Sequence, residues 1–474
     1  MAGCTFNQAL VRAALAAQDA RLPARWTVGV VRDVYGRLRF AVDAWRPLAD
    51  GEEAEGPRQY ADPDEIYPVE AHNFLVAAAA GLQPYSGSSP LLYRDDFSNP
   101  ALLFRHEDWH RTIVTVSAET TEDGAEAPSR EISVHLLDRQ ITGQDWLRPP
   151  ADAPVHPHRL VFFGLKGGVG RSTALTMVAW GLARQGKRVL LVDFDLESPG
   201  LSGLLLPSEQ VAECGLVDWL VEDAVGQGDE VLRRMVSASP LAETTTGAIR
   251  VVAAMGREEQ DYLAKLARAY TDVPSPNGPK RMGARMRQVL ELLEIQEQPD
   301  VVLIDSRAGL HDLAAVSITS LADTALLFAT DSAQTWMGYR QLFTHWQRRP
   351  DVVTHVRDRL AIVRALTPKS DREGGVRRFQ HETYELFAET LYDDIPPGAE
   401  VESGVLEHVP VYFHPSESDE AAPHFPILVD WDERFQEFDP RLRAGQGGVT
   451  EAQIDATFGA LLQWVTERVS GGGE

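Results

Sequence analysis

The fold of this chain follows from one stretch of sequence, Leu160-Val161-Phe162-Phe163-Gly164-Leu165-Lys166-Gly167-Gly168-Val169-Gly170-Arg171-Ser172-Thr173. An apolar run enters the stretch, glycines fill its centre, and a helical pattern of apolar residues follows it. This order of strand, glycine-rich loop and helix is the context that a phosphate-binding loop requires. Glycines allow a tight turn whose N–H groups face an anion, and the N-terminus of the next helix adds further donors. The stretch therefore predicts a phosphate-binding site.

The loop departs from the standard pattern, in which glycine stands at position 165 and lysine at position 171. Here those residues are Leu165 and Arg171, and a lysine, Lys166, comes early. The string K-G-G-V-G-R-S-T resembles the deviant Walker A motif of the ParA/MinD family of P-loop ATPases, in its variant K-G-G-V-G-R subgroup. The resemblance implies a catalytic Lys166 that reaches the partner's phosphates in a nucleotide-sandwich dimer. It also implies that ATP is bound by Lys166, Gly167, Gly168, Val169, Gly170, Arg171, Ser172 and Thr173.

Arg171 is the main departure from the family pattern. Both arginine and lysine are positively charged, but a guanidinium is a broad fork and an ammonium a compact point charge. Phosphate binding is expected to survive this exchange, whereas the rate of hydrolysis depends on where the charge lies. Arg171 is therefore a third candidate catalytic residue beside Lys166 and Asp195.

Three aspartates follow apolar runs typical of buried parallel strands: Asp193, Asp195 and Asp305. Strand carboxyl ends are where α/β folds place their ligand chemistry. By the resemblance, Asp193 lies near a magnesium ion and Asp195 positions or deprotonates the attacking water. Asp305 matches a Walker B aspartate, which holds magnesium together with a hydroxyl such as that of Ser172. The predicted metal ligands are thus Ser172, Asp193 and Asp305, although Asp193 and Asp195 could also simply end a strand in solvent.

Arg307 stands where the family typically has a proline in its switch loop. An arginine beside a γ-phosphate stabilises charge, either in cis or across a dimer. A surface arginine in a loop is an equally good interpretation. The adenine is expected at late loops, with residues 364–370 and 411–414 as candidates.

Alternating strand and helix patterns from 159 to 366 predict an α/β fold, a mostly parallel sheet covered by helices on both faces, as in P-loop NTPases. Residues 158–474 form this predicted domain, with an acidic, Pro-rich C-terminal extension. A Pro-rich stretch separates it from residues 1–150, a smaller α+β domain of unknown role. That first domain is predicted to contain helices at 5–20 and 70–81, a hairpin from 25 to 42, and an exposed loop at 50–67.

A zinc-protease signature, H-E-x-x-H, occurs at His106-Glu107-Asp108-Trp109-His110. The chemistry needs both histidines on one face of a helix. The flanking residues 102–104 and 112–116 are β-rich, and we expect two strands joined by a polar turn. Neighbouring side chains on a strand point in opposite directions, so the pattern does not favour a metal site.

Two later helices carry informative faces. A helix near 280–295 is predicted to place Arg281, Arg285 and Arg287 on its exposed side. A helical stripe of apolar residues at 454–469 is accompanied mostly by acidic residues. A membrane-surface helix would carry lysine and arginine instead, so this helix is expected to pack on its own domain.

Composition narrows the setting. The 474 residues carry a net charge of −25, which disfavours binding to DNA or anionic lipid. Two cysteines make no disulfide framework, the N-terminus is unlike a signal peptide, and no apolar run is long enough to span a bilayer. A cytoplasmic protein is expected.

These features predict a dimerising switch that binds ATP and Mg²⁺, hydrolyses ATP slowly to ADP and phosphate, and regulates a protein partner. The resemblance suggests a multi-gene bacterial system of the defence type. One alternative is a non-hydrolysing ATP sensor or scaffold, with Arg171 as the cause. Another is an ATPase-gated effector whose N-terminal domain carries the output.

Overall fold

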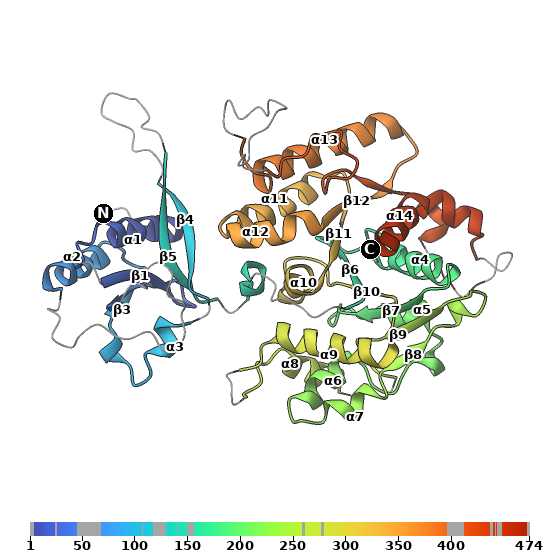
Figure 1. Ribbon diagram of the computed structural model, residues 1–474, viewed down its shortest axis with the longest axis horizontal. Helices are drawn as coiled ribbons and strands as arrows, with labels where there is room; N and C mark the ends of the chain where they lie inside the picture. The colour runs from blue at the N-terminus through green and yellow to red at the C-terminus, as the bar shows by residue number, and fades with distance from the viewer. Residues whose placement is uncertain are drawn as a thin grey trace, which may run out of the picture. The chain divides into compact units, whose positions relative to one another are not determined.

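The computed structural model describes residues 4–23, 26–44, 68–106, 108–116, 129–140, 142–148, 156–257, 261–275, 279–395, 412–436, 439–440, 442 and 448–471. The chain divides into two compact units, Met1–Gln144 and Asp145–Glu474. Figure 1 shows the elements of each unit. The predicted exposed loop at 50–67 and most of the Pro-rich stretch before residue 158 lie outside the described residues.

The first unit is a mixed five-stranded sheet in the order β3-β2-β1-β5-β4. Its strands are β1 (Trp26–Arg32), β2 (Leu38–Ala44), β3 (Ser86–Leu92), β4 (His110–Val116) and β5 (Arg130–Asp138). Its helices are α1 (Phe6–Asp19), α2 (Val69–Ala80) and α3 (Ala101–Phe104). β1 and β2 pair antiparallel, which confirms the predicted hairpin, and α1 and α2 confirm the two predicted helices.

Alternation along the strands supplies two apolar faces in this unit. Val30 and Phe40 pack with α1 and α2, whereas Val31 and Ala41 pack with α3. The strand predicted at 102–104 is wrong, because these residues form the short helix α3. Pro100 caps this helix, and so short an apolar run does not distinguish strand from helix by its pattern.

The H-E-x-x-H string does not form one helix. His106 follows α3 and His110 opens β4, so the two histidines do not share a helix face. Glu107 lies outside the described residues. Within the described part of the chain, no group of three or more His, Cys, Asp or Glu side chains is placed to hold a metal ion.

The second unit is an eight-stranded sheet in the order β13-β12-β11-β6-β10-β7-β9-β8. Its strands are β6 (His158–Gly164), β7 (Arg188–Asp193), β8 (Val236–Ala238), β9 (Ala248–Val252), β10 (Val301–Asp305), β11 (Thr324–Ala329), β12 (Leu360–Thr367) and β13 (Ile427–Asp430). Neighbours pair parallel, except that β8 runs antiparallel to β9. The mostly parallel sheet confirms the predicted fold class.

Helices cover both faces of this sheet (Figure 1). One face packs against α4 (Arg171–Arg184), α5 (Leu201–Leu205) and α14 (Glu451–Gly471). The other packs against α6 (Leu216–Asp223), α9 (Met282–Glu297), α10 (Asp312–Val316), α11 (Ala333–Gln347), α12 (Pro350–Val356) and α13 (Arg372–Thr390). Further short helices are α7 (Gly228–Leu232) and α8 (Tyr262–Ala269). Neighbouring residues of β6 alternate between the two cores, which explains its continuous apolar run.

The C-terminal region belongs to the body of this unit. β13 lies within the predicted Pro-rich extension and adds an edge strand beside β12. α14 buries Ile454, Phe458, Leu461 and Val465 against the sheet. The prediction that this helix packs on its own domain is therefore confirmed.

One prediction about α9 is wrong. Arg285 was expected on the exposed side, but its side chain is fully buried. Its guanidinium donates to the Ala269 carbonyl at 3.0 Å and lies 3.3 Å from the Asp223 carboxylate. A buried guanidinium is tolerated when its donors are satisfied in this way. Arg281 and Arg287 remain partly exposed.

Candidate functional site

The glycine-rich loop joins β6 to α4 as its sequence predicts. β6 ends at Gly164 and α4 begins at Arg171. Gly168 and Gly170 both have a φ of +76°, the left-handed region that favours glycine. Gly170 is also the residue that precedes the first turn of α4, whose N–H groups point out of the helix end. The loop therefore offers backbone donors of the kind that bind phosphate.

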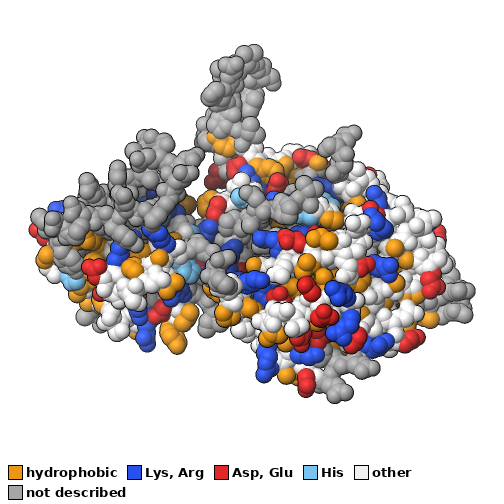
Figure 2. Space-filling view, turned by 60° about the horizontal axis from the view of Figure 1, so that its bottom comes forward, with side chains coloured by type: hydrophobic (Ala, Val, Ile, Leu, Met, Phe, Trp, Pro, Cys, Tyr) orange, Lys and Arg blue, Asp and Glu red, His pale blue; other side chains and the backbone are white. Residues whose placement is uncertain are grey.

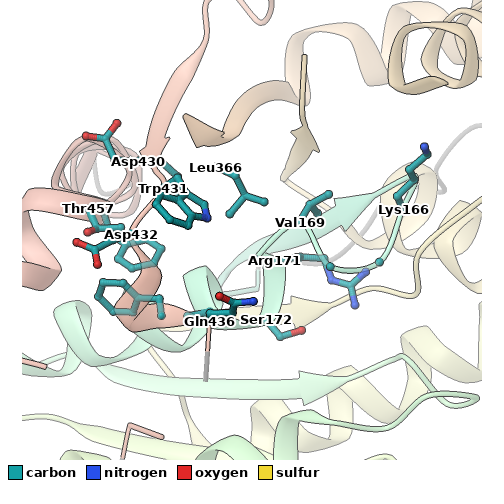
Figure 3. A pocket seen from close by; sticks show the side chains of 17 residues that line it. Lys166, Val169, Arg171, Ser172, Leu366, Asp430, Trp431, Asp432, Gln436 and Thr457 are labelled. Atoms are coloured by element: carbon teal, nitrogen blue, oxygen red, sulfur yellow. The ribbon is translucent and has the colours of Figure 1, made fainter. Parts of the chain in front are cut away.

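A cavity of about 590 Å³ opens along this loop. One wall consists of residues 166–173, so every residue predicted to bind nucleotide lines it. The opposite wall comes from β12, β13 and the segment that follows them, as Figure 3 shows. The residues of that wall are Leu366, Val429, Asp430, Trp431, Asp432, Phe435, Gln436, Thr457 and Phe458. The volume suits a small organic ligand.

Most of this second wall was missed at the level of sequence. Leu366 falls in the predicted range 364–370, but Trp431 and its neighbours were not foreseen. The available signal was the apolar island at 425–428 followed by an aspartate, which is the end of a strand. The other candidate range does not line the cavity: its Phe413 instead donates its backbone N–H to Asp393 at 2.8 Å.

Two of the predicted metal ligands lie side by side at the carboxyl edge of the sheet. Asp193 and Asp305 are register partners on the neighbouring strands β7 and β10. They are only 1% and 2% exposed. The Asp193 carboxylate accepts backbone N–H groups of Asp195 at 3.1 Å and Leu201 at 3.2 Å. Its orientation is thus fixed by the loop that follows β7.

Residues of the loop reach these acids directly. Ser172 Oγ donates to Asp305 at 2.7 Å, and Arg171 Nε donates to the other oxygen of Asp305 at 2.6 Å. Arg171 Nη2 also lies 3.3 Å from Asp195 Oδ2. The structure therefore brings together Arg171, Ser172, Asp195 and Asp305. A single guanidinium bridges two of the acids.

Negative charge is in surplus at this point. Burial, together with the neighbouring Asp305, raises the pKa of Asp193 to about 8. Burial also raises the pKa of Asp195, although Arg171 opposes that shift. Carboxylate and hydroxyl oxygens are the ligands that magnesium prefers, and a dication would relieve this surplus. The donor set of Ser172, Asp193 and Asp305 therefore fits Mg²⁺.

Lys166 points elsewhere. It is exposed, and its ammonium contacts the side-chain oxygen of Gln334 on α11. Figure 3 shows this ammonium directed away from the side of the cavity where Trp431 lies. Within its own chain, Lys166 thus lines the cavity rim without meeting the acids.

A second, smaller cavity of about 360 Å³ lies in the first unit. Its lining combines apolar residues of β1, β3 and α3 with two arginines, Arg39 and Arg139. Among the described helices, none has the length and apolarity needed to cross a membrane.

A phosphate-type loop between strand and helix, with acids at the ends of neighbouring parallel strands, defines a P-loop nucleotide-binding fold. Residues 159–259 match a family model described as an AAA domain. A 59-residue segment is 46% identical to the sporulation initiation inhibitor protein Soj of Bacillus subtilis (strain 168). That match covers 12% of this chain and 23% of Soj.

Two solved structures share the general arrangement. A ParA family ATPase from Chlorobium tepidum TLS is 14% identical, with a TM-score of 0.39, over 65% of this chain and 98% of its own. The pNOB8 ParA bound to nonspecific DNA is 16% identical, with a TM-score of 0.40, over 67% and 99%. The motifs and the two sequence matches identify the second unit as a P-loop ATPase domain of the ParA/MinD type.

Proposed function

We propose that this chain binds ATP with Mg²⁺ and acts as a nucleotide-dependent switch that dimerises and regulates a protein partner. One observation carries the proposal: the glycine-rich loop lies beside a surplus of buried carboxylates at the ends of β7 and β10. Phosphate would lie on the loop, and the base would lie toward Trp431 and Leu366. Ser172, Asp193 and Asp305 would hold the magnesium, which neutralises phosphate charge when bound.

Hydrolysis is assigned to residues that already surround this point. Asp195 would position or accept a proton from the attacking water, and Arg171 would meet charge that develops on the transferred group. Each would have to change partner, since Arg171 now bridges Asp195 and Asp305. Turnover is therefore expected to be slow.

Dimerisation is assigned to Lys166. Its ammonium is exposed and lies apart from the acids of its own chain, as expected for a group that serves a partner's phosphates. Lys166→Ala should therefore leave ATP affinity within about threefold while abolishing the ATP-dependent dimer. Sedimentation velocity with ATP and magnesium measures this. Lys187→Ala, at the turn before β7, is the matched control, and a Lys166→Ala dimer of unchanged strength would contradict the cross-dimer role.

A non-hydrolysing ATP sensor is the second candidate function, and the Arg171 bridge favours it. A guanidinium held by two carboxylates lowers the negative charge available to a cation. Steady-state phosphate release separates the two functions, with Asp195→Ala as the control. Release above the Asp195→Ala background supports the ATPase, and release equal to it supports the sensor.

The partner is expected to be a protein, not DNA. The pNOB8 relative is described as bound to nonspecific DNA. This chain carries a net charge of −25, and Figure 2 shows side chains of both signs interspersed on one face. Nonspecific DNA binding depends on clustered cations and falls with salt. A pull-down with and without ATP tests for the partner, and the same experiment would test a place in a defence-type system.

A further inference from the structure

Beside the proposed nucleotide site lies a group of four side chains, here named the Glu197 cluster: Glu197, Tyr270, Arg307 and His311. Arg307 forms an ion pair with Glu197 Oε1, and the Tyr270 hydroxyl donates to the same oxygen. His311 Nε2 lies 3.6 Å from it. The other oxygen, Oε2, is buried and has no hydrogen-bond partner among the described residues. A single carboxylate thus collects three potential donors on one side.

The backbone around Arg307 is held against the start of the phosphate loop. The Ser306 N–H donates to the Phe162 carbonyl at 3.1 Å. The Gly309 N–H donates to the Gly164 carbonyl, also at 3.1 Å. Arg307 lies between these two anchors, so its main chain is fixed beside the end of β6. Any change of partner by Arg307 therefore needs only its long side chain to move.

Glu197 comes from the loop that carries Asp195. The Phe194 N–H donates to the Asp305 carbonyl at 2.9 Å, which ties this loop to the end of β10. Burial lowers the pKa of His311, whereas Glu197 and, more weakly, Asp195 raise it. Asp195 and the cluster therefore share one electrostatic environment. The cluster adjoins the acids of the nucleotide site.

We propose that Arg307 senses the terminal phosphate of the nucleotide, and that Glu197 retains Arg307 as a counter-ion until that phosphate binds. The proposal rests on the function proposed above. A γ-phosphate competes for the guanidinium because both are anionic partners of the same fork. When Arg307 leaves, Tyr270 and His311 remain with Glu197, so its carboxylate is not left unpaired. The exchange couples the switch loop to nucleotide state.

The test compares two nucleotides that differ in the terminal phosphate. Equilibrium dissociation constants of AMP-PNP, a non-hydrolysable ATP analogue, and of ADP are measured on the full chain with magnesium. Arg307→Ala should weaken AMP-PNP binding about tenfold and leave ADP binding within about twofold, because ADP lacks the group that Arg307 senses. Glu197→Gln should strengthen AMP-PNP binding about threefold or more, again without affecting ADP, because the competing charge is removed.

Controls separate this role from a structural one. Arg234→Ala breaks another arginine–glutamate pair, with Glu213 at 2.9 Å, whose side chains are 48% and 58% exposed. It should change neither constant. Arg307→Lys keeps the charge and should recover part of the preference for AMP-PNP over ADP. Thermal melting of each variant checks folding.

The outcomes are distinct. If the wild-type chain binds neither nucleotide, the proposed function fails and this inference falls with it. If the wild type binds both but Arg307→Ala shifts them equally, or shifts neither, the sensing role is wrong while the proposed function stands. If Glu197→Gln weakens AMP-PNP as Arg307→Ala does, Glu197 positions the arginine and does not restrain it, which overturns the counter-ion role.

Discussion

Buried arginine–aspartate pairs occur in both units, but they differ in charge balance. In the first unit, Arg32 Nε donates to Asp138 at 2.8 Å as one member of a matched pair. Burial alone would raise the pKa of Asp138, yet the hydrogen bonds and charge of Arg32 outweigh it and lower that pKa. In the second unit, Arg171 faces more carboxylate than it can neutralise, and the pKa of Asp193 rises instead.

The difference separates a structural pair from a site. A matched buried pair is complete, so removing one member mainly costs stability. A surplus of buried carboxylate is complete only with an added cation, so such a cluster points to a ligand. The predictions below test this distinction, from the largest expected effect to the smallest.

Asp138→Ala should remove about 3–5 kcal/mol from the free energy of unfolding of the first unit, because it leaves the Arg32 guanidinium buried and unpaired. Urea denaturation of the full chain measures the transition that the variant shifts. The double variant Arg32→Leu/Asp138→Leu should recover most of the loss, since no charge is then left unpaired. A loss under about 1 kcal/mol, or a double variant as unstable as the single one, would contradict the matched-pair interpretation.

Arg171→Lys should change the single-turnover hydrolysis rate about tenfold, or roughly 1.4 kcal/mol, while nucleotide affinity stays within about threefold. Both side chains neutralise phosphate in the ground state, but a compact ammonium cannot span Asp195 and Asp305 as the guanidinium does. Quenched-flow hydrolysis and equilibrium binding measure the two quantities. Rates and affinities that both move less than about threefold would show that Arg171 is a neutral replacement for lysine.

The nucleotide-free protein should lose stability as pH rises through the range where Asp193 is protonated only in the folded state. The pKa of Asp193 is raised from 3.8 to about 8, so folding retains a proton that the unfolded chain releases. Stability from this group is therefore complete below pH 4 and falls toward pH 8, by at most about 1.4 kcal/mol per pH unit.

Asp193→Asn removes this titration. Melting temperatures of both proteins are compared from pH 5 to pH 8 in EDTA, where the range is set by about the two pKa values. The variant should gain relative to the wild type as pH rises. A difference that does not change with pH would mean that Asp193 ionises normally in the folded state.

Arg234→Ala should cost less than about 0.5 kcal/mol, because its pair with Glu213 is exposed and screened by solvent. Chemical denaturation under the same conditions as for Asp138→Ala gives a direct comparison. A cost similar to that of the buried pair would mean that burial does not set the energetic scale.

Sequence patterns were sufficient for what depends on local order. The loop at 166–173 and the apolar strands ending in Asp193 and Asp305 follow from spacing alone, because parallel strands bring their ends to one edge. Contacts between distant segments were not accessible. The Arg307–Glu197 pair and the Trp431 wall of the cavity join residues far apart in sequence. Arg285 shows the same limit, because its burial depends on carbonyls from other helices.

The central claim is that the carboxylate surplus at the ends of β7 and β10 takes up magnesium together with ATP. Isothermal titration calorimetry of ATP into the full chain, with magnesium and with EDTA, in buffers of different ionisation enthalpy, tests it most directly. Saturable binding should be at least about tenfold tighter with magnesium and should release protons near pH 7, since Asp193 must ionise to hold a cation. Binding of equal strength in EDTA without proton release, or no saturable binding at all, would contradict the claim.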